Sequence, residues 1–271
     1  MGEERSEGLT EHFVSMGFTA GRLKTGTPPR LAKNTIDWDK MNLALGDKNP
    51  TPFSYSTDNF NPPNEPCFTT NSNSLSHDVI QDNLERSPMF SGEIDGIGPR
   101  YCPSIEDKIH RFPNRNSHVL FLEPEWKNSD QIYLNGFSTS LPEDVQLKSL
   151  RQVSVMEEVE FFRPGYAIEY DFFPPSQLKT TLESKNVPGL FFAGQMNGTS
   201  GYEEAAAQGL IAGINSSLKI KKREPLVLTR DCSYIGVMID DLITKDTLEP
   251  YRMFTSRAEY RLLLRCSNTV D

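Results

Sequence analysis

Hydrophobic and polar positions along this chain follow two periodicities, and each predicts a different kind of element. Apolar runs and alternating apolar positions predict strands at residues 119–122, 131–137, 159–162 and 166–170. Helical spacing predicts helices over residues 8–17 and 143–153, and a helical C-terminal piece over residues 233–265. There is no internal repeat, and the mixture of strands and helices predicts an α/β or α+β fold.

Three segments follow neither periodicity. Residues 47–90 are rich in Asn, Pro, Ser and Thr, which favours irregular structure and turns over any long helix. Residues 21–30 form a basic loop stiffened by two prolines, without the spacing of a phosphate-binding P-loop. Residues 219–225 form a charged linker that separates the α/β part from the helical C-terminal piece.

The most informative pattern lies in residues 189–215. A short apolar run at residues 190–193 predicts a buried strand, and a helix is predicted from Tyr202. Between them lies a turn with three glycines, Gly194, Gly198 and Gly201. Small residues at Ala205, Gly209 and Gly213 predict a helix face that packs closely against a sheet. A strand, a glycine turn and a helix N-terminus together form a site typical of nucleotide cofactors.

Composition narrows the class of protein. The 271 residues are 24% charged and 37% hydrophobic, as in a soluble globular protein, and no apolar run is long enough for a membrane span. A net charge of −9 argues against a protein whose whole surface binds nucleic acid, but it allows a local basic patch. The four cysteines are far apart and the histidines lack ligand spacing, so we expect reduced thiols and no metal site.

Cys102 is the cysteine with the most distinctive surroundings. Ser104 and Asp107 resemble a capping box that opens a helix, so Cys102 is expected just before a helix N-terminus, with Arg100 two residues away. Both features favour the thiolate form of Cys102. The alternative is a small buried hydrophobic residue, which is the usual role of an isolated cysteine.

Arginines dominate the end of the chain. Ser256 and Glu259 resemble a second capping box, and the helix it predicts carries an arginine every fourth residue: Arg257, Arg261 and Arg265. With Arg252 and two tyrosines nearby, such a face suits phosphates and unstacked bases. The alternative is a solvated, salt-bridged helix face. Glu203 and Glu204 begin the helix at Tyr202, where carboxylates suit the helix dipole.

Seven segments, in the same order, resemble the GidA/MnmG family of tRNA wobble-uridine modification enzymes. They are residues 21–30 (GRLKTGTPPR), 98–108 (GPRYCPSIEDK), 133–142 (YLNGFSTSLP), 163–170 (RPGYAIEY), 192–198 (FAGQMNG), 201–209 (GYEEAAAQG) and 249–265. Together they extend over nearly the whole chain, which makes the match far more specific than any single glycine pattern.

The resemblance implies an FAD-dependent, NADH-using cytoplasmic enzyme that acts on tRNA. With a GTPase partner of the MnmE type, in a heterotetramer, the family builds a (carboxymethyl)aminomethyl group on C5 of the wobble uridine (U34). Methylenetetrahydrofolate is the implied one-carbon donor, glycine or ammonium the amine donor, and a homodimer the implied assembly.

The resemblance also implies roles for individual residues. In the glycine turn, Gln195 matches a family FAD contact, with Gly194, Gly198 and Gly201 around it. Residues 98–112 match the segment assigned to NAD, which includes Gly98, Pro99, Arg100, Tyr101, Cys102, Pro103 and Ser104. Cys102 matches a cysteine regarded as catalytic. Arg252 and Arg261 match positions linked to tRNA, and Arg257 joins them through the predicted stripe.

The resemblance implies an α/β fold with a Rossmann-like FAD-binding domain. Residues 1–30 and 163–220 are assigned to that domain, residues 31–162 to an α/β insertion domain associated with NAD, and residues 226–271 to the start of a helical C-terminal domain. The family's N-terminal Gly-x-Gly-x-x-Gly turn is missing, so we expect an internal fragment with an incomplete FAD-binding domain, an unpaired edge at residues 190–193 and marginal stability.

Two other functions are compatible with the same residues. A flavin oxidoreductase acting on a small molecule would use the same cofactor turn, because one fold serves many chemistries. A non-catalytic tRNA-binding fragment would keep the arginines but not need Cys102.

Overall fold

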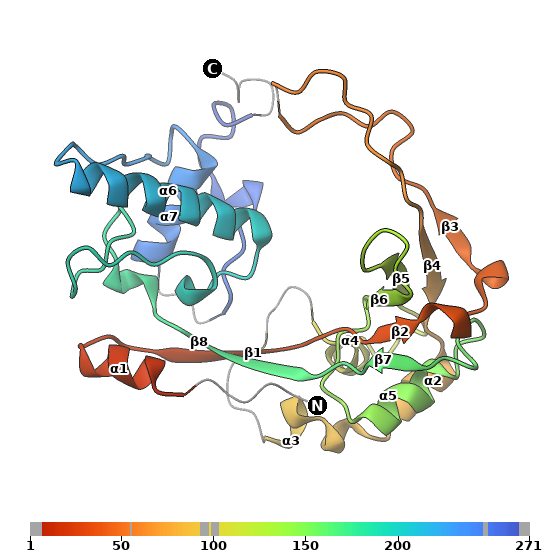
Figure 1. Cartoon of the computed structure of the whole chain (residues 1–271). Coiled ribbons are helices and arrows are strands. Elements are labelled where there is room, and N and C mark those ends of the chain that lie inside the picture. Colours follow the sequence, from red (N-terminus) through yellow and green to blue (C-terminus); the bar gives the residue numbers. More distant parts are fainter. Residues whose placement is uncertain (1–6, 55, 93–97, 99–102, 246–248, 266–271) are drawn as a thin grey trace. The chain divides into compact units, whose positions relative to one another are not determined.

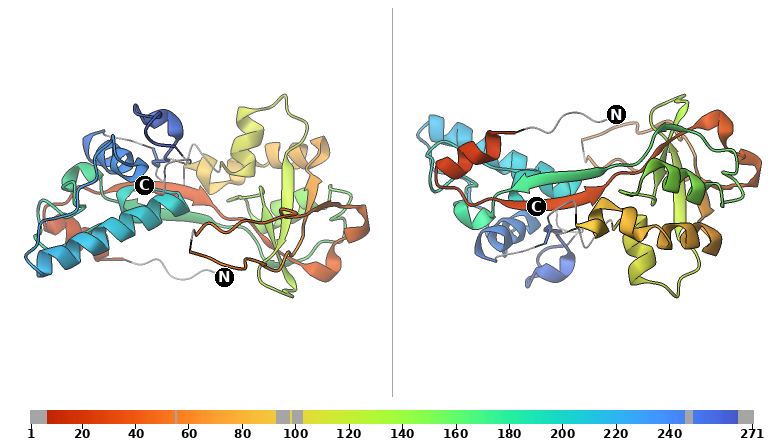
Figure 2. Two further views of the ribbon diagram at one scale, coloured as in Figure 1. Left: turned by 90° about the horizontal axis from the view of Figure 1, so that it is seen from above. Right: turned by 90° about the horizontal axis from the view of Figure 1, so that it is seen from below.

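The computed structural model describes residues 7–54, 56–92, 98, 103–245 and 249–265 (Figure 1). The chain divides into two compact units. Unit 1 comprises Met1–Leu23, Asp95–Arg100 and Glu169–Asp271, and unit 2 comprises Lys24–Ile94 and Tyr101–Ile168. Strands β1 (Gly21–Gly26) and β8 (Ala167–Phe172) form a two-stranded sheet, and they run side by side in both views of Figure 2.

Unit 2 is built on a six-stranded sheet in the order β3-β4-β5-β6-β2-β7. Its strands, in chain order, are β2 (Arg30–Ala32), β3 (Asn42–Ala44), β4 (Cys67–Asn71), β5 (Val119–Pro124), β6 (Gln131–Asn135) and β7 (Phe161–Arg163). The neighbouring strands pair antiparallel. Its helices are α2 (Ser74–Gln81), α3 (Pro88–Ser91), α4 (Ile105–Arg111) and α5 (Glu143–Leu150).

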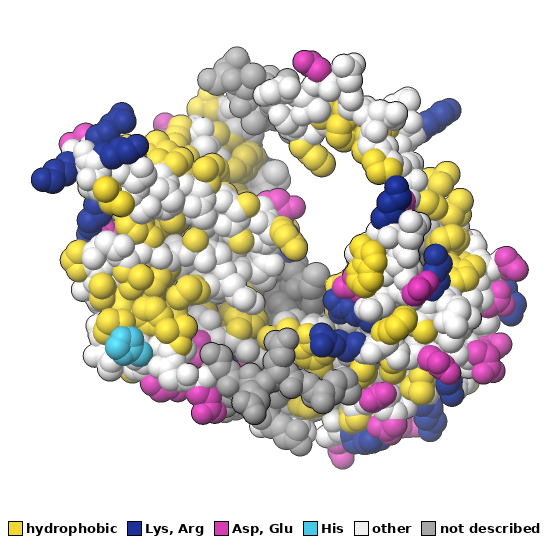
Figure 3. Space-filling view, in the orientation of Figure 1, with side chains coloured by type: hydrophobic (Ala, Val, Ile, Leu, Met, Phe, Trp, Pro, Cys, Tyr) yellow, Lys and Arg dark blue, Asp and Glu magenta, His cyan; other side chains and the backbone are white. Residues whose placement is uncertain are grey.

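Alternation along β5 decides which face of this sheet is covered. Leu120 and Leu122 are fully buried in the core with residues of α2, α4 and α5, whereas Val119 and Phe121 are exposed. Side chains at alternate positions of a strand point to opposite faces, so one face meets the helices and the other faces away from them. On the side seen in Figure 3, acidic and basic side chains intermingle around α5. Asp144 of α5 forms an ion pair with Arg86.

Unit 1 contains the helices α1 (Leu9–Ser15), α6 (Tyr202–Ile220) and α7 (Tyr234–Thr244). Its core combines residues of α6 and α7 with an aromatic cluster of Phe13, Phe18, Phe173 and Phe192, in which the rings of Phe13 and Phe173 lie 5.1 Å apart, centroid to centroid. Short 3₁₀ helices, several of which link the longer elements, are η1 (Lys33–Thr35), η2 (Trp38–Lys40), η3 (Leu84–Arg86), η4 (Pro175–Gln177), η5 (Gly194–Asn197) and η6 (Thr255–Arg257).

Most of the predicted elements are confirmed. The helices α1, α5 and α6 and the strands β5 to β8 occur where the periodicities place them, within a few residues at each end. Of the helical piece predicted over residues 233–265, α7 forms the first part and ends at Thr244. The segment 47–90 is irregular to residue 66 but then forms β4 and α2. Residues 21–30 are not a loop, because residues 21–26 form β1 beside β8.

The strand predicted at residues 190–193 is wrong. Phe191 makes only an isolated antiparallel bridge to Glu183, and the amide of Phe192 donates to the carbonyl of Leu182 at 3.1 Å. An apolar run predicts burial, but a strand also needs a neighbouring ladder. Within the described residues no such ladder lies beside this run.

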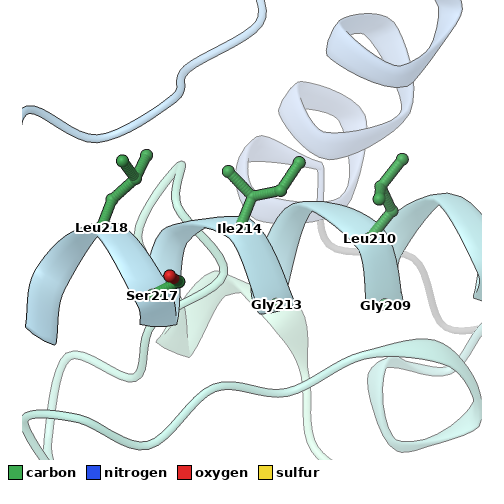
Figure 4. A pocket seen from close by; sticks show the side chains of 6 residues that line it. All are labelled: Gly209, Leu210, Gly213, Ile214, Ser217 and Leu218. Atoms are coloured by element: carbon green, nitrogen blue, oxygen red, sulfur yellow. The ribbon is translucent and has the colours of Figure 1, made fainter. Parts of the chain in front are cut away.

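The predicted packing face of α6 is also wrong. The buried side chains of this helix belong to Glu204, Gln208, Ile211, Ala212 and Asn215. Gly209 and Gly213 are exposed, and a Cβ at either would meet no described atom outside the helix backbone within 4 Å. Leu210, Ile214 and Leu218 project from one side of α6 above these glycines and line an open groove of about 440 Å³ (Figure 4).

Candidate functional site

The glycine turn before α6 has a backbone that requires glycine at two positions. Gly194, the first residue of η5, has φ 71°, and Gly198, which ends η5, has φ 68°. Residues with a Cβ rarely adopt this left-handed region. The turn therefore has a fixed shape that the sequence pattern alone only suggested.

Gln208 of α6 holds this turn from inside. Its Oε1 accepts from the amide of Gly194 at 2.8 Å and from Nδ2 of Asn197 at 2.9 Å, and its Nε2 donates to Oγ1 of Thr199 at 2.9 Å. Gln208 is fully buried. Sequence reasoning missed it, although polar residues at helical spacing, Glu204, Gln208 and Asn215, are a signal for a buried hydrogen-bond network.

Several groups at this turn fit a ligand that carries both donors and acceptors. Gln195 is exposed, and its side chain acts on the nearby Tyr170 hydroxyl, whose pKa is raised by burial and in part lowered again by Gln195. The helix cap Gly201 offers no side-chain acceptor to the first amides of α6. Oδ1 of Asn197 is buried without a partner in the described chain. A flavin nucleotide, with carbonyls, hydroxyls and phosphates, fits such a set.

Glu204, in the first turn of α6, connects the turn to residues 251–253. Its Oε1 accepts from the amide of Met253 at 2.8 Å and from Nε of Arg252 at 3.1 Å. Burial raises the pKa of Glu204, but the hydrogen bonds from Met253 and its own amide, together with Arg252, hold it below the usual value. The carboxylate is therefore charged and paired inside the protein.

The arginine stripe predicted over residues 256–265 does not exist as a helix face. Only residues 255–257 form a 3₁₀ turn, and residues 261–263 form a separate turn. The carbonyl of Arg257, which a helix would pair with the amide of residue 261, accepts instead from Nη2 of Arg230 at 3.2 Å. The same Nη2 donates to Oε1 of Glu259 at 2.7 Å, so long-range ion pairs replace the local capping box.

The three arginines assigned to tRNA thus have different surroundings. Arg252 pairs with Glu204. Arg257 lies 4.5 Å over the Tyr251 ring and 3.6 Å from Oδ2 of the buried Asp241. Arg261 lies in an exposed turn.

The segment assigned to NAD is described only in part. Residues 99–102, including Pro99, Arg100, Tyr101 and Cys102, lie outside the described residues. The predicted cap is confirmed, since Oγ of Ser104 accepts from the amide of Asp107 at 3.1 Å at the start of α4.

Glu106 is a buried carboxyl in this segment that sequence reasoning missed. Its Oε1 accepts from the amide of Ser140 at 2.8 Å and from its hydroxyl at 3.0 Å. Its Oε2 has no partner in the part of the chain that the structure describes. Burial raises the pKa of Glu106, against the lowering effect of these hydrogen bonds. The signal in sequence is weak, because a glutamate in a first helical turn is usually solvated.

Other site types find no support in the described residues. No group of His, Cys, Asp and Glu there could hold a metal ion, and Cys67 and Cys232 are free thiols. The helices described are also too short or too polar to cross a membrane.

Comparison with known proteins places these residues in context. The model of the family described as Glucose inhibited division protein A matches residues 1–224. A tRNA uridine 5-carboxymethylaminomethyl modification enzyme MnmG from Flavobacterium psychrophilum is 60% identical over 269 residues, covering 98% of this chain and 43% of the relative. The MnmG of Chlorobium phaeobacteroides is 58% identical over 262 residues, covering 96% and 42%.

A solved structure agrees with the fold. GidA of Aquifex aeolicus, in its form I crystal, superposes with a TM-score of 0.87 at 51% identity, covering 97% of this chain and 45% of that one. The mixed α/β fold is thus confirmed. The chain spans less than half the length of the relatives it matches.

Proposed function

We propose, because this chain belongs to the Glucose inhibited division protein A (GidA) family, that it is part of a flavin-dependent enzyme that modifies tRNA. The observation that carries the proposal is the built turn at residues 194–204. Its fixed backbone, its buried support by Gln208 and its uncapped helix start fit a cofactor, and the relatives' names specify a tRNA uridine as the substrate.

FAD is the cofactor we assign to this turn, where it would supply redox chemistry. Gln195 is the residue assigned to a direct side-chain contact, since it is exposed beside Tyr170. Gly194, Gly198 and Gly201 would let the backbone approach the cofactor. The first amides of α6 would donate to cofactor oxygens, because a helix N-terminus favours acceptors and negative charge.

We assign the finer chemistry from the same family membership. The reaction is NADH-dependent addition of a (carboxymethyl)aminomethyl group to C5 of the wobble uridine, with methylenetetrahydrofolate as co-substrate. The partners are an MnmE-type GTPase, in a heterotetramer, and a second copy of the chain in a homodimer. The place of action is the cytoplasm, where tRNA is modified.

We also retain the residue and domain assignments as proposals. Cys102 is the proposed catalytic residue within an NAD segment of residues 98–112. Residues 1–30 and 163–220 are assigned to the FAD-binding domain, residues 31–162 to the insertion domain and residues 226–271 to the start of a helical domain. Residues within 226–243 and 251–253 contribute to the same core as α6.

The test is a titration of the protein, at the length its gene encodes, with FAD and with unfractionated bacterial tRNA. Flavin absorbance that remains with the protein after gel filtration, together with saturable tRNA binding, is expected. Flavin binding without tRNA binding would favour a small-molecule oxidoreductase instead. A protein that binds no flavin would refute the proposal.

Cys102→Ser separates an enzyme from a non-catalytic binding module. The purified serine variant should still bind tRNA. Cells whose only copy of the protein is this variant should lose most of the modified uridine that is found in digests of their tRNA. Unchanged uridine modification would favour the non-catalytic function.

A further inference from the structure

We propose that Arg252 is a positioning residue of the cofactor turn, acting through Glu204. The inference rests on the proposed function, because it concerns how this chain would hold FAD. It gives Arg252 a role at the cofactor turn beyond the one that the sequence pattern assigned, and separates it from Arg261.

The ion pair of Arg252 with Glu204 is largely buried on the acidic side. The side chain of Glu204 is 5% exposed, whereas that of Arg252 is 31% exposed, and Nε of Arg252 lies 3.1 Å from Oε1 of Glu204. A buried carboxylate that loses its cation is left with an uncompensated charge, which is strongly unfavourable. Oε2 of Glu204 has no partner in the described chain. The negative charge of this carboxylate is therefore stabilised through the hydrogen bonds that Oε1 accepts.

Residues next to Arg252 are fastened to the same turn by backbone bonds. The amide of Tyr251 donates to the carbonyl of Gly198 at 2.8 Å, and Thr199 and Tyr251 form a parallel bridge. The amide of Met253 donates to Glu204. The cofactor turn is therefore held on both sides, by Gln208 from the helix and by residues 251–253 from the later segment.

Arg257 holds the backbone at Arg252 in place. Its Nε donates to the carbonyl of Arg252 at 2.8 Å, while its guanidinium lies over the Tyr251 ring and beside Asp241. Arg252 engages Glu204 through Nε, which leaves its other guanidinium N–H groups able to meet an anion, so the pair fixes the position of this side chain without by itself excluding an RNA contact. Arg261, in an exposed turn, is the better candidate for an RNA contact.

The consequence for the cofactor follows from the position of Glu204. This residue lies in the first turn of α6, the end proposed to face FAD. Without Arg252, Glu204 must turn toward solvent or take up a proton. Turning outward breaks its bond to Met253 and moves the helix start, so FAD binding should weaken while RNA contacts elsewhere persist.

The experiment compares Arg252→Met, Glu204→Gln and the double variant, at the length that the gene encodes. FAD affinity is measured by flavin fluorescence quenching, and affinity for unfractionated tRNA by filter binding. We expect Arg252→Met to weaken FAD binding about tenfold or more. Glu204→Gln in the double variant should restore most of the loss, because it removes the uncompensated charge and keeps an acceptor for Met253.

Matched variants control for general damage. Glu224→Gln changes an exposed carboxylate outside the turn and should leave FAD affinity within about twofold, as expected for an exposed carboxylate. Arg252→Lys keeps the charge and should bind FAD better than Arg252→Met. Arg261→Met should weaken tRNA binding and leave the visible spectrum of bound flavin unchanged.

The outcomes are distinguishable. If the unmodified protein binds no FAD, the proposed function fails and this inference fails with it. If it binds FAD and tRNA but Arg252→Met lowers only tRNA affinity, the inference alone is overturned. A double variant no better than Arg252→Met would also overturn it, because no phosphate contact or general damage predicts rescue by Glu204→Gln.

Discussion

The carboxylate of Glu204 occupies the space that a Cβ atom on Gly201 would need, since such an atom would overlap Oε2 of Glu204. Gly201 is thus required by packing within the helix cap, although its φ of −94° is open to any residue. The glycine turn contains two kinds of glycine, those needed for backbone conformation and one needed for space.

Gly201→Ala should therefore destabilise the chain. The methyl group would displace a buried, paired carboxylate and weaken its bonds to Arg252 and Met253. We expect a loss of about 2 kcal/mol in the free energy of unfolding, measured by urea denaturation, because a buried charged hydrogen bond is disrupted. Unchanged stability would show that Glu204 can move without cost.

Gly209→Ala and Gly213→Ala should have the opposite effect in this 271-residue chain. A Cβ at either glycine meets no described atom outside the helix backbone within 4 Å. Alanine in a helix interior stabilises by about 0.5–1 kcal/mol relative to glycine. Thermal unfolding monitored by circular dichroism would check this. A lowered melting temperature would mean that this face of α6 is covered.

Lys219→Met should reduce the acid sensitivity of unit 1. Lys219 is the main cause that lowers the pKa of Glu183 from 4.5 to about 2, with the amide of Gly189 and Lys179 contributing. A depressed carboxyl pKa adds stability above pH 4.5 that is lost as the pH falls toward 2. Near pH 6 the variant should lose on the order of 1–2 kcal/mol, and at pH 3 the difference should shrink.

Lys221→Met is the matched control for this experiment. Lys221 is an exposed neighbour at the end of α6, where Lys and Arg side chains of residues 219–223 gather on the surface seen in Figure 3. Urea unfolding between pH 3 and pH 6 should show the changed slope for Lys219→Met only. Equal slopes for the two variants would contradict the role assigned to the Lys219–Glu183 pair.

Unit 2 should lose stability below neutral pH through a histidine pair of which His77 is buried and His118 half-buried. The rings of His77 and His118 lie 5.3 Å apart, and Nε2 of His77 lies 2.7 Å from Oγ of Ser72. Burial is the main cause that lowers the pKa of both rings below the usual 6.5, and Lys108 and Arg115 add to this at His118.

The sign of the effect follows from proton binding. Below pH 6.5 the unfolded chain binds more protons at these rings than the folded chain, so stability falls as the pH decreases toward the folded pKa values. The slope is at most about 1.4 kcal/mol per pH unit for each ring. His118→Gln should flatten it in urea unfolding between pH 5 and pH 7, whereas the exposed His110→Gln should not.

The sequence predicted what depends on near neighbours. The cap at Ser104, the strand at residues 119–122 and the helix beginning at Tyr202 each rest on residues a few positions apart, and all three are confirmed. The α/β class and the family were likewise readable from ordered local motifs, because those motifs are contiguous in the chain.

The sequence did not predict what depends on distant partners. The spacing of Arg257 and Arg261 predicts one helix face. Instead, Arg257 contacts Arg230 and Asp241, and no α-helix forms in the described residues there. The small residues of α6 predict a packed face, but the buried face contains Glu204 and Gln208 instead.

By itself, then, the sequence determined the fold class, the position of the glycine turn and the family. Only the tertiary structure decided which residues hold that turn and which arginines remain at the surface. The physical reason is that backbone preference and periodicity act over a few residues, whereas Glu204 meets Arg252 across 48 positions of the chain. Which cation lies beside a buried carboxylate depends on the folded state, and no local sequence pattern predicts it.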